Sequence, residues 1–404
     1  MAVSSSQVRR IGASAEAFVA DVTQHLRRPS QRGNALRYVR GMLVGEGRKS
    51  LDPVAQRAGW SSGEYHSVQH FVADAPWDWT GVLRRCAERV VPQIGLRALV
   101  LDDTSFPKSG GASPGVKRQY CGQLGKRANC QVGVSLHAAG ERHTMPLGWA
   151  LYLPADWIDD PERCRRAKVP AGTRFRTKHE LALELVDTIC EWRIDTAPVL
   201  GDQAYGDSTE LRLALAEREM TYCMNVTRSL GLYAPDTDFA TPARASRRGP
   251  GPSKLRADRA PCSAEQIGQS ATDTRELVYR TTSRDEELTG VFSFHRVRAA
   301  KTLRDRGEAP AEEWLIVQHP HASHDRFEYW LCNLPQDTDP CELAELARMR
   351  WTIELDYKQL KGHLGLNHFE GRSWAGWHKH CTLVTVAHAW LTEQRLDPKA
   401  QRPD

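Results

Sequence analysis

The sequence predicts a mixed α/β protein, and three observations lead to this fold class. Residues 1–92 show amphipathic helical patterns. Residues 93–226 alternate short apolar runs with helical patterns, in the order strand-strand-strand-helix-strand-helix-strand. Residues 227–338 hold several alternating segments typical of strands, and helical patterns return in 339–397. We therefore expect an all-α N-terminal domain, an α/β core formed by 93–226 and 339–397, and an inserted β-rich subdomain at 227–338.

Composition limits the classes of protein that fit this chain of 404 residues. The length allows a large core and two or three folded units. The net charge of +5 permits a polyanionic partner without requiring one. The ten cysteines form no C-x-x-C pair, which favours reduced, mostly structural thiols over a zinc site. No leader-like or membrane-spanning apolar run is found, so we expect no membrane partner and a cytoplasmic, nucleoid-associated location.

The N-terminal region is basic and begins with two predicted helices, Ser14–Leu26 and Asn34–Leu43. The segments Ser50–Gly59 and Ser62–Val72 then have the pattern of a helix, a glycine turn and a second helix. This is the outline of a helix-turn-helix, whose second helix can enter a major groove. A small helical bundle with a solvated basic face fits the same pattern, and the two interpretations stay open.

The α/β core begins with an apolar segment, Leu96–Asp103, which predicts a buried strand ending in two carboxylates. The segment Lys108–Lys126 is rich in Gly, Ser and basic residues and predicts a long loop. Asn129–His137 and Met145–Leu153 predict the two further strands of an antiparallel meander. A strand that delivers acids at its end is a frequent element of an active site.

The second half of the core contains a helix with a clear start and a second strand that ends in an acid. Thr177 and Glu180 form a predicted capping box ahead of the helix that runs to Trp192. Pro198–Asp202 predicts a short strand, followed by a helix at Ser208–Glu219 and a strand at Thr221–Val226.

The inserted region combines a basic loop with strands. Residues 241–259 are rich in Pro, Gly, Ser and Arg and predict a mobile basic loop. Four segments after it predict strands: Glu276–Thr281, Val291–Val297, Trp314–Gln318 and Phe327–Asn333.

A late helix, predicted at Pro340–Leu364, carries a charged stripe. Arg350, Glu354 and Lys361 lie at i, i+4 and i+11, and Lys358 lies beside them. An apolar stripe on a neighbouring face would anchor the helix on a core while Glu354 points into a cleft. An ordinary surface helix with i,i+4 ion pairs is the alternative.

Together the chain offers three acids, Asp103, Asp202 and Glu354, with no thiolate or histidine near them in sequence. Carboxylate oxygens favour a hard cation, Mg²⁺ or Mn²⁺, over zinc. Two such ions stabilise the entering and leaving oxygens of a displacement at phosphorus, which would mean phosphodiester hydrolysis or transesterification. Taken singly, a turn pair at Asp102 and Asp103 and a helix N-cap at Asp202 are simpler explanations.

Four motifs together resemble the DDE transposases of bacterial insertion sequences, over nearly the whole chain. They are LDDTSFPK at 101–108, QYCGQLGKRANCQV at 119–132, GDQAYGD at 201–207, and RWTIE at 350–354 with EGRSW at 370–374. The resemblance implies an RNase H-like catalytic core, two metal ions held by acids, and a β-strand insertion between the second Asp and the Glu. The region 227–338 lies where such an insertion belongs.

By this resemblance the catalytic, metal-binding acids are Asp103, Asp202 and Glu354. The family's first aspartate precedes a threonine, which points to Asp103. Asp102 stays open as the first acid, because a shift of one residue on a strand reverses which side chain faces the site.

The family's late motif, Tyr-x2-Arg-x3-Glu-x6-Lys, is matched by Arg350, Glu354 and Lys361, whereas Ala347 occupies the tyrosine position. Arg350 and Lys361 would bind phosphates beside the scissile bond. The departure at Ala347 leaves open whether excision passes through a hairpin.

The resemblance implies an enzyme that cuts double-stranded DNA at the terminal inverted repeats of its element and joins the 3′-OH to target DNA, working as a homodimer on DNA. Salt-sensitive binding should follow. The expected DNA contacts are Arg350, Lys361, Lys358, Lys108, Lys126, Arg127, Arg247 and Arg248. A transposase-derived DNA-binding protein without turnover, and a structure-selective RNase H-like nuclease, are the alternatives.

Overall fold

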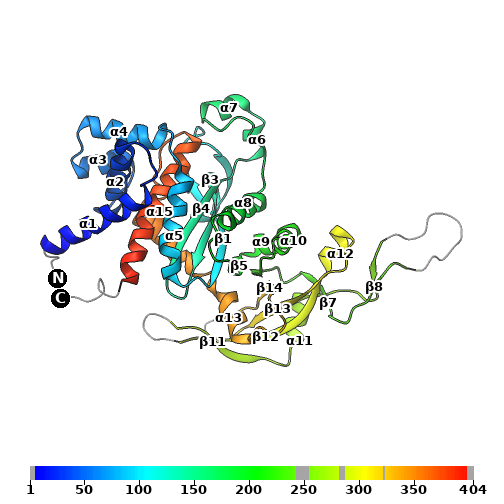
Figure 1. The fold of residues 1–404 in the computed structure, drawn as a ribbon. Coiled ribbons are helices and arrows are strands. Elements are labelled where there is room, and N and C mark those ends of the chain that lie inside the picture. Colours follow the sequence, from blue (N-terminus) through cyan, green and yellow to red (C-terminus); the bar gives the residue numbers. More distant parts are fainter. Residues whose placement is uncertain (1–4, 243–253, 282–286, 322–323, 398–404) are drawn as a thin grey trace. The chain divides into compact units, whose positions relative to one another are not determined.

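The computed structural model describes residues 5–242, 254–281, 287–321 and 324–397 (Figure 1). The chain forms two compact units, Met1–Thr196 with Thr352–Asp404, and Ala197–Trp351. The first unit therefore contains the two ends of the chain, and the second is a continuous segment between them.

The first unit combines helices with an antiparallel sheet. Its helices are α1 (Ser5–Val22), α2 (Pro29–Leu43), α3 (Leu51–Ala58), α4 (Ser62–Ala73), α5 (Trp79–Ile94), α6 (Ala155–Ile158), α7 (Pro161–Arg166), α8 (Lys178–Glu191), α14 (Thr352–Gly362) and α15 (Trp374–Leu396). Its strands are β1 (Ala98–Pro107), β2 (Lys117–Cys121), β3 (Lys126–Ala139) and β4 (Thr144–Leu151), with a 3₁₀ turn at Gly122–Leu124. The all-helical prediction for the N-terminal region is confirmed.

Helices α3 and α4 confirm the predicted order of a helix, a glycine turn and a second helix, which fits both interpretations of this segment. Gly59 ends α3 in the left-handed conformation with φ +64°, where a glycine has no Cβ to clash. Ser61 then begins α4 through a capping box with Glu64, because each side chain accepts from the other residue's backbone N–H. The turn and the start of the second helix are thus fixed by local sequence.

The sheet of the first unit is centred on β3, which pairs antiparallel with β1, β2 and β4. Helices α5 and α15 contact β4, while α8 contacts β3 and β4 (Figure 1). On one face, Trp149 donates to Thr385 of α15 at 2.9 Å. On the other face, a Cβ on Gly148 would meet Leu185 of α8 at 2.8 Å. The sheet is therefore covered by α15 on one face and α8 on the other.

Two details of this sheet differ from the sequence prediction. β1 continues to Pro107, so its acids lie inside the strand and not at its end. Thr104, Ser105 and Phe106 are buried, because β3 pairs with β1 along its whole length, and this extends the strand beyond the apolar run. The predicted loop at Lys108–Lys126 contains β2, which pairs with the start of β3.

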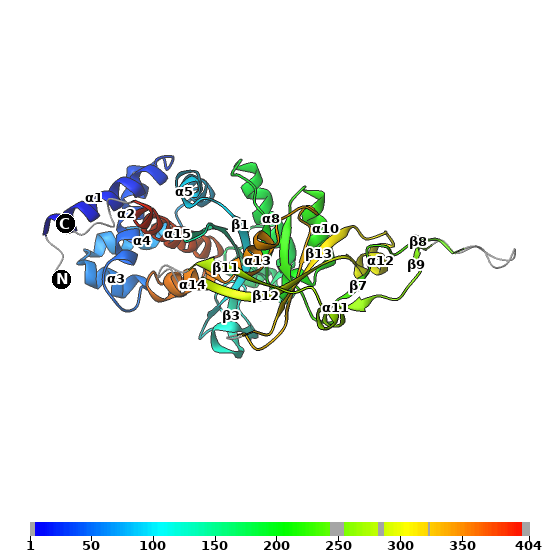
Figure 2. The same ribbon diagram turned by 90° about the horizontal axis from the view of Figure 1, so that it is seen from below.

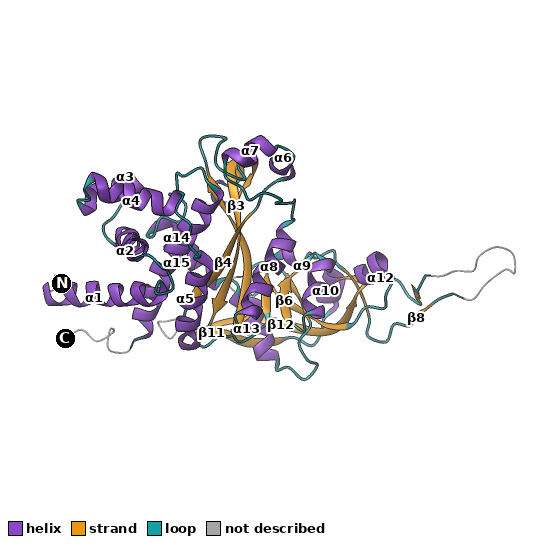
Figure 3. Cartoon of the chain, turned by 45° about the horizontal axis from the view of Figure 1, so that its top comes forward, coloured by secondary structure: helices purple, strands orange, loops and turns teal. Residues whose placement is uncertain are grey.

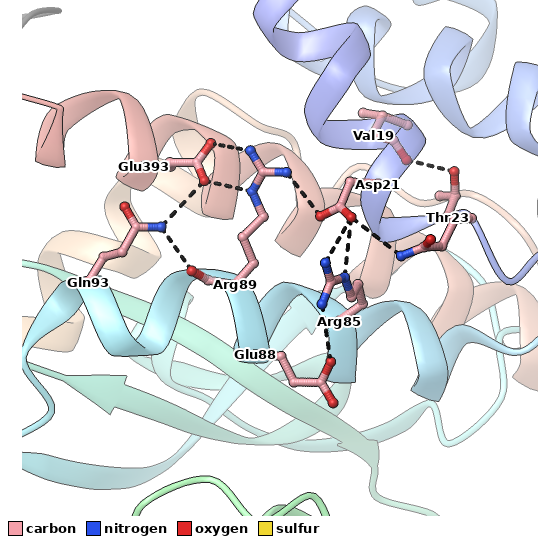
Figure 4. A network of polar contacts seen from close by, with 9 residues as sticks. Val19, Asp21, Thr23, Arg85, Glu88, Arg89, Gln93 and Glu393 are labelled. Carbon is pink, nitrogen blue, oxygen red and sulfur yellow. Dashed lines mark hydrogen bonds and ion pairs between the residues drawn. The ribbon is translucent and has the colours of Figure 1, made fainter.

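Arg89 of α5 joins helices from both ends of the chain (Figure 4). Its guanidinium donates to the Glu393 carboxylate of α15 at 2.6 and 3.0 Å and to Asp21 of α1 at 2.9 Å. Arg85, one turn earlier, also donates to Asp21 at 2.9 Å. These charge-assisted bonds fix α1 and α15 against α5.

The second unit is a mixed sheet with helices. Its strands are β5 (Val199–Gly201), β6 (Tyr222–Asn225), β7 (Gly231–Tyr233), β8 (Phe239–Ala240), β9 (Arg256–Ala257), β10 (Cys262–Ser263), β11 (Arg275–Thr281), β12 (Glu287–Ala299), β13 (Glu312–His319) and β14 (Glu328–Cys332). Its helices are α9 (Gln203–Gly206), α10 (Thr209–Glu217), α11 (Ala264–Ser270), α12 (Ala300–Arg306) and α13 (Pro340–Met349).

The strands predicted in 227–338 continue the sheet that contains β5 and β6 (Figure 3). β11, β12, β13 and β14 pair antiparallel in that order, β14 pairs antiparallel with β6, and β6 pairs parallel with β5. The four predicted strands are confirmed, while the division of the chain into functional domains stays a prediction.

The prediction of one helix at Pro340–Leu364 is wrong, because α13 ends at Met349 and α14 begins at Thr352 (Figure 2). Leu346 of α13 is buried in the second unit, whereas Ile353 and Leu360 of α14 are buried in the first. Each half buries its apolar stripe in a different core, which accounts for the break. Arg350 lies in the break, so it does not share a helix with Glu354.

Candidate active site

The two acids of β1 lie on opposite faces of the sheet, because successive side chains of a strand alternate. Asp102 is opposite Ser135 of β3, and Ser135 Oγ lies 2.6 Å from the hydroxyl of Tyr357 in α14. Asp102 therefore shares the face that α14 covers. Asp103 points to the α8 face, where its Oδ2 accepts a hydrogen bond from Lys178 Nζ at 2.6 Å.

Helix α14 is attached to this sheet by buried polar contacts. Asp356 accepts from His137 of β3 at 3.2 Å, and His388 of α15 lies 3.4 Å from its other oxygen. Burial raises the pKa of Asp356, but the two histidines outweigh it, and the net result is a pKa well below the usual value. Burial raises the pKa of Tyr357 well above its usual value, so this residue is a neutral hydrogen-bonding group. The contacts fix the rotation of α14 about its axis.

Glu354 lies in the first turn of α14 and is exposed, as is Lys358 one turn later. Lys361 donates to the backbone oxygen of Ser105 in β1 at 3.0 Å and lies 3.4 Å from Gln123 Oε1. Burial lowers the pKa of Lys361 to about 8. Its ammonium is thus held against β1, and its binding to phosphate stays a prediction.

Asp202 belongs to the second unit, directly after β5, and is the N-cap of α9. Its Oδ1 accepts from the backbone N–H of Ala204 at 2.9 Å and of Tyr205 at 3.3 Å. The simpler N-cap interpretation is therefore confirmed. Within the described residues Oδ2 has no hydrogen-bond partner, so capping leaves one oxygen for another ligand.

Arg350 and Ala347 also lie in the second unit, at the end of α13. Arg350 is half-buried, and Ala347 is buried among the apolar residues of α13. A tyrosine ring at position 347 would not fit this buried position without repacking.

The acids have the donor chemistry for a hard divalent cation, since each offers carboxylate oxygens. In the structure Asp103 Oδ2 is ion-paired with the ammonium of Lys178 at 2.6 Å. No group of three or more His, Cys, Asp or Glu side chains that could hold a metal is assembled in the part of the chain that the structure describes. A site that joins Asp103, Asp202 and Glu354 is therefore a proposal.

The other basic residues predicted to contact DNA differ in exposure. Lys126 and Arg127 are exposed at the start of β3. Lys108 is half-buried and donates to the backbone oxygen of Phe369, and burial lowers its pKa to about 8. Arg247 and Arg248 lie outside the described residues.

Sequence reasoning missed Lys178, His137 and Asp356 as parts of this site. One signal was available for Lys178, because a lysine is unfavourable at the first position of a helix. The pairing of His137 with Asp356 had no local signal, since the two residues are far apart in the chain.

Comparison with known proteins agrees with the predicted resemblance. Residues 21–286 match the family described as DDE superfamily endonuclease, a range that includes Asp103 and Asp202 but ends before Glu354. The chain is also 30% identical over 163 residues to a probable transposase for insertion sequence element IS701 from Microchaete diplosiphon. That alignment covers 40% of this chain and 40% of the relative. Within the described residues, no helix is long and apolar enough to cross a membrane.

Proposed function

Since the chain belongs to the DDE superfamily of endonucleases, we propose that it is a transposase that cleaves DNA at the terminal inverted repeats of an insertion sequence. The freed 3′-OH is then joined to target DNA. The observation that carries the proposal is the family match over residues 21–286, which contains the acids on β1 and after β5.

Endonucleases of this superfamily generally use divalent metal ions. In the proposal, Asp103, Asp202 and Glu354 hold two Mg²⁺ or Mn²⁺ ions, which would stabilise the entering and leaving oxygens at phosphorus. Asp202 offers Oδ2 while its Oδ1 caps α9, so its carboxylate is oriented by the backbone before any ligand binds. Glu354 is presented by α14, whose rotation is fixed by Asp356. Asp102 is the alternative first acid, and it lies on the face of the sheet that α14 covers, whereas Asp103 lies on the α8 face.

The proposed DNA interface begins in the domain 1–92, where α4 would enter a major groove. Its exposed side includes His66, Gln69 and His70, which can hydrogen-bond with base edges. Exposed cations on β3 and α14 would bind the phosphate backbone of the DNA, and these are Lys126, Arg127 and Lys358. Cutting and joining two ends requires that both are held at once, so the proposed active form is a homodimer on DNA.

Further cations proposed to contact DNA are Arg350, Lys361, Lys108, Arg247 and Arg248. In the proposed domain division, residues 93–226 and 339–397 form an RNase H-like catalytic domain, and 227–338 form an insertion with the basic loop 241–259.

Nicking of a supercoiled plasmid with Mn²⁺ tests the proposal, using wild type and Asp202→Asn. Asparagine is as good an N-cap as aspartate, so this variant keeps the cap of α9 and removes the anionic ligand. We expect wild type to nick and Asp202→Asn to lose at least about 100-fold in rate. Asp339→Asn, at the N-cap of α13, is the matched control and should keep full activity.

Equal absence of nicking in wild type and Asp202→Asn, with DNA binding intact, would support the alternative of a DNA-binding protein without turnover. Nicking without strand-transfer products, tested with labelled 3′-OH ends, would support a structure-selective nuclease.

A further inference from the structure

The carboxylate of Asp103 is ion-paired with a lysine to which the proposed function gives no role. Lys178 Nζ lies 2.6 Å from Asp103 Oδ2, and the two side chains are 38% and 30% exposed. The lysine comes from α8 and the acid from β1, so the pair spans the sheet and the helix that covers it. The pair is therefore only partly exposed and joins two elements of the first unit.

The position of Lys178 in its helix indicates that the charge serves the contact with Asp103. Lys178 is the first residue of α8, directly after the N-cap Thr177. A cation at this end opposes the helix dipole, which favours acids in the first turn and cations in the last. The capping box of Thr177 and Glu180 already begins the helix, so α8 gains nothing from this ammonium.

We propose that Lys178 is the counter-ion of Asp103 in the metal-free protein and competes with the divalent cation for the same carboxylate oxygen. This inference rests on the proposed function, because it takes Asp103 as a metal ligand. Mg²⁺ binds a carboxylate oxygen at about 2.0–2.1 Å. An ammonium in hydrogen-bond contact with Oδ2 occupies the same region, and two cations repel each other there. Metal binding at Oδ2 therefore requires Nζ to move away.

Lysine suits this exchange better than arginine. Its ammonium is a compact point charge on a flexible four-carbon stem, so it can leave Oδ2 without moving the backbone of α8. While it is bound, it also holds the carboxylate of Asp103 in one rotamer. Lys178 is thus a positioning residue that acts through Asp103, and its expected signature is a change in metal affinity.

The test measures Mn²⁺ affinity of the full chain from the electron paramagnetic resonance signal of free Mn²⁺. We expect Lys178→Met, which keeps the length of the side chain and removes its charge, to bind Mn²⁺ about three- to tenfold more tightly. Lys178→Arg keeps the charge and should stay within about twofold of wild type. Asp103→Asn should weaken binding, and adding Lys178→Met to it should then have no further effect.

Lys168→Met is the matched control, because it removes the same charge from another Lys–Asp pair, with Asp74. It should leave Mn²⁺ affinity unchanged, which excludes a general effect of net charge. Far-UV circular dichroism and the melting temperature verify that each variant is folded. If Lys178→Met binds Mn²⁺ no more tightly than Lys168→Met while Asp103→Asn still weakens binding, the role of Lys178 is refuted and the proposed function stands. If Asp103→Asn binds like wild type, Asp103 is not a ligand and the role of Lys178 is refuted, while the proposed function stands with Asp102 as the first acid.

Discussion

The contact between Asp356 and His137 is expected to determine the stability of the helix that carries Glu354. Asp356 is 9% exposed, and its histidine partners are 0% and 1% exposed. Asp356→Ala would leave both buried imidazoles without the carboxylate between them. An unsatisfied buried polar group costs about 1–3 kcal/mol, and breaking a buried charged contact costs about 3–5 kcal/mol. We therefore expect a loss of about 3 kcal/mol in the free energy of unfolding at pH 7.

The assay is urea denaturation followed by far-UV circular dichroism at several pH values. The folded-state pKa of Asp356 lies below the unfolded value, so its contribution is fully present above the unfolded pKa of about 4 and is lost as the pH falls toward the folded pKa. The difference between wild type and Asp356→Ala should therefore shrink as the pH falls below about 4. Asp74→Ala, which removes the acid of an exposed ion pair, should cost less than about 1 kcal/mol.

A loss for Asp356→Ala no larger than that for Asp74→Ala would refute the reasoning, since it would mean that the buried carboxylate is not stabilising. A pH-independent difference would refute the electrostatic part alone. In the nicking assay we expect Asp356→Ala to lose activity even at temperatures where it is folded, because α14 would no longer hold Glu354 in one orientation.

Three further predictions follow from the packing. Burial lowers the pKa of His378 and His380 to about 4, below the unfolded value, so the unfolded state binds more protons between about pH 6.5 and 4. The contribution of each histidine to the free energy of unfolding is therefore fully present above about pH 6.5 and should fall by roughly 3 kcal/mol as the pH drops to about 4. In thermal melts, the melting temperature of His380→Leu should decline less steeply with falling pH than that of wild type. Arg89→Ala, which breaks the contacts to Asp21 and Glu393, should cost about 2 kcal/mol in urea denaturation, whereas Arg84→Ala, at an exposed i,i+4 pair, should cost about 0.5 kcal/mol or less. Gly206→Ala would place a Cβ 1.9 Å from the backbone oxygen of Asn225 and should lower the melting temperature strongly, while Gly63→Ala meets nothing within 4 Å and should not; equal melting temperatures would refute the clash.

Local signals were sufficient to predict most elements of the fold. The capping box before α8 and the glycine after α3 act over three or four residues, so the start and the end that they set could be read from sequence. The apolar runs predicted the strands β1, β3 and β4, but they did not predict where β1 ends. Thr104 and Ser105 read as the end of a strand, and only their pairing with β3 buries them.

The candidate site could be predicted as a set of residue types but not as a set of contacts. The motifs pointed to Asp103 and Asp202 without showing that one is ion-paired with Lys178 and the other caps α9. The attachment of α14 through His137 and His388 joins residues that are remote in sequence, and no local pattern encodes such a contact.

The break between α13 and α14 shows what a periodic pattern leaves undetermined. Leu346, Ile353 and Leu360 are spaced by seven residues, which fits one continuous helix. The same spacing also fits two helices, because each half of the stripe can be buried in its own core. Here Leu346 is buried in the second unit, while Ile353 and Leu360 are buried in the first. Arg350 and Glu354 are four residues apart, but no continuous helix joins them. The conformation of the connection at Arg350 and Trp351 therefore sets the spacing of their side chains. A family motif therefore specifies which residues the chain supplies, whereas the two cores that bury the flanking helices determine the local conformation in which each residue is held.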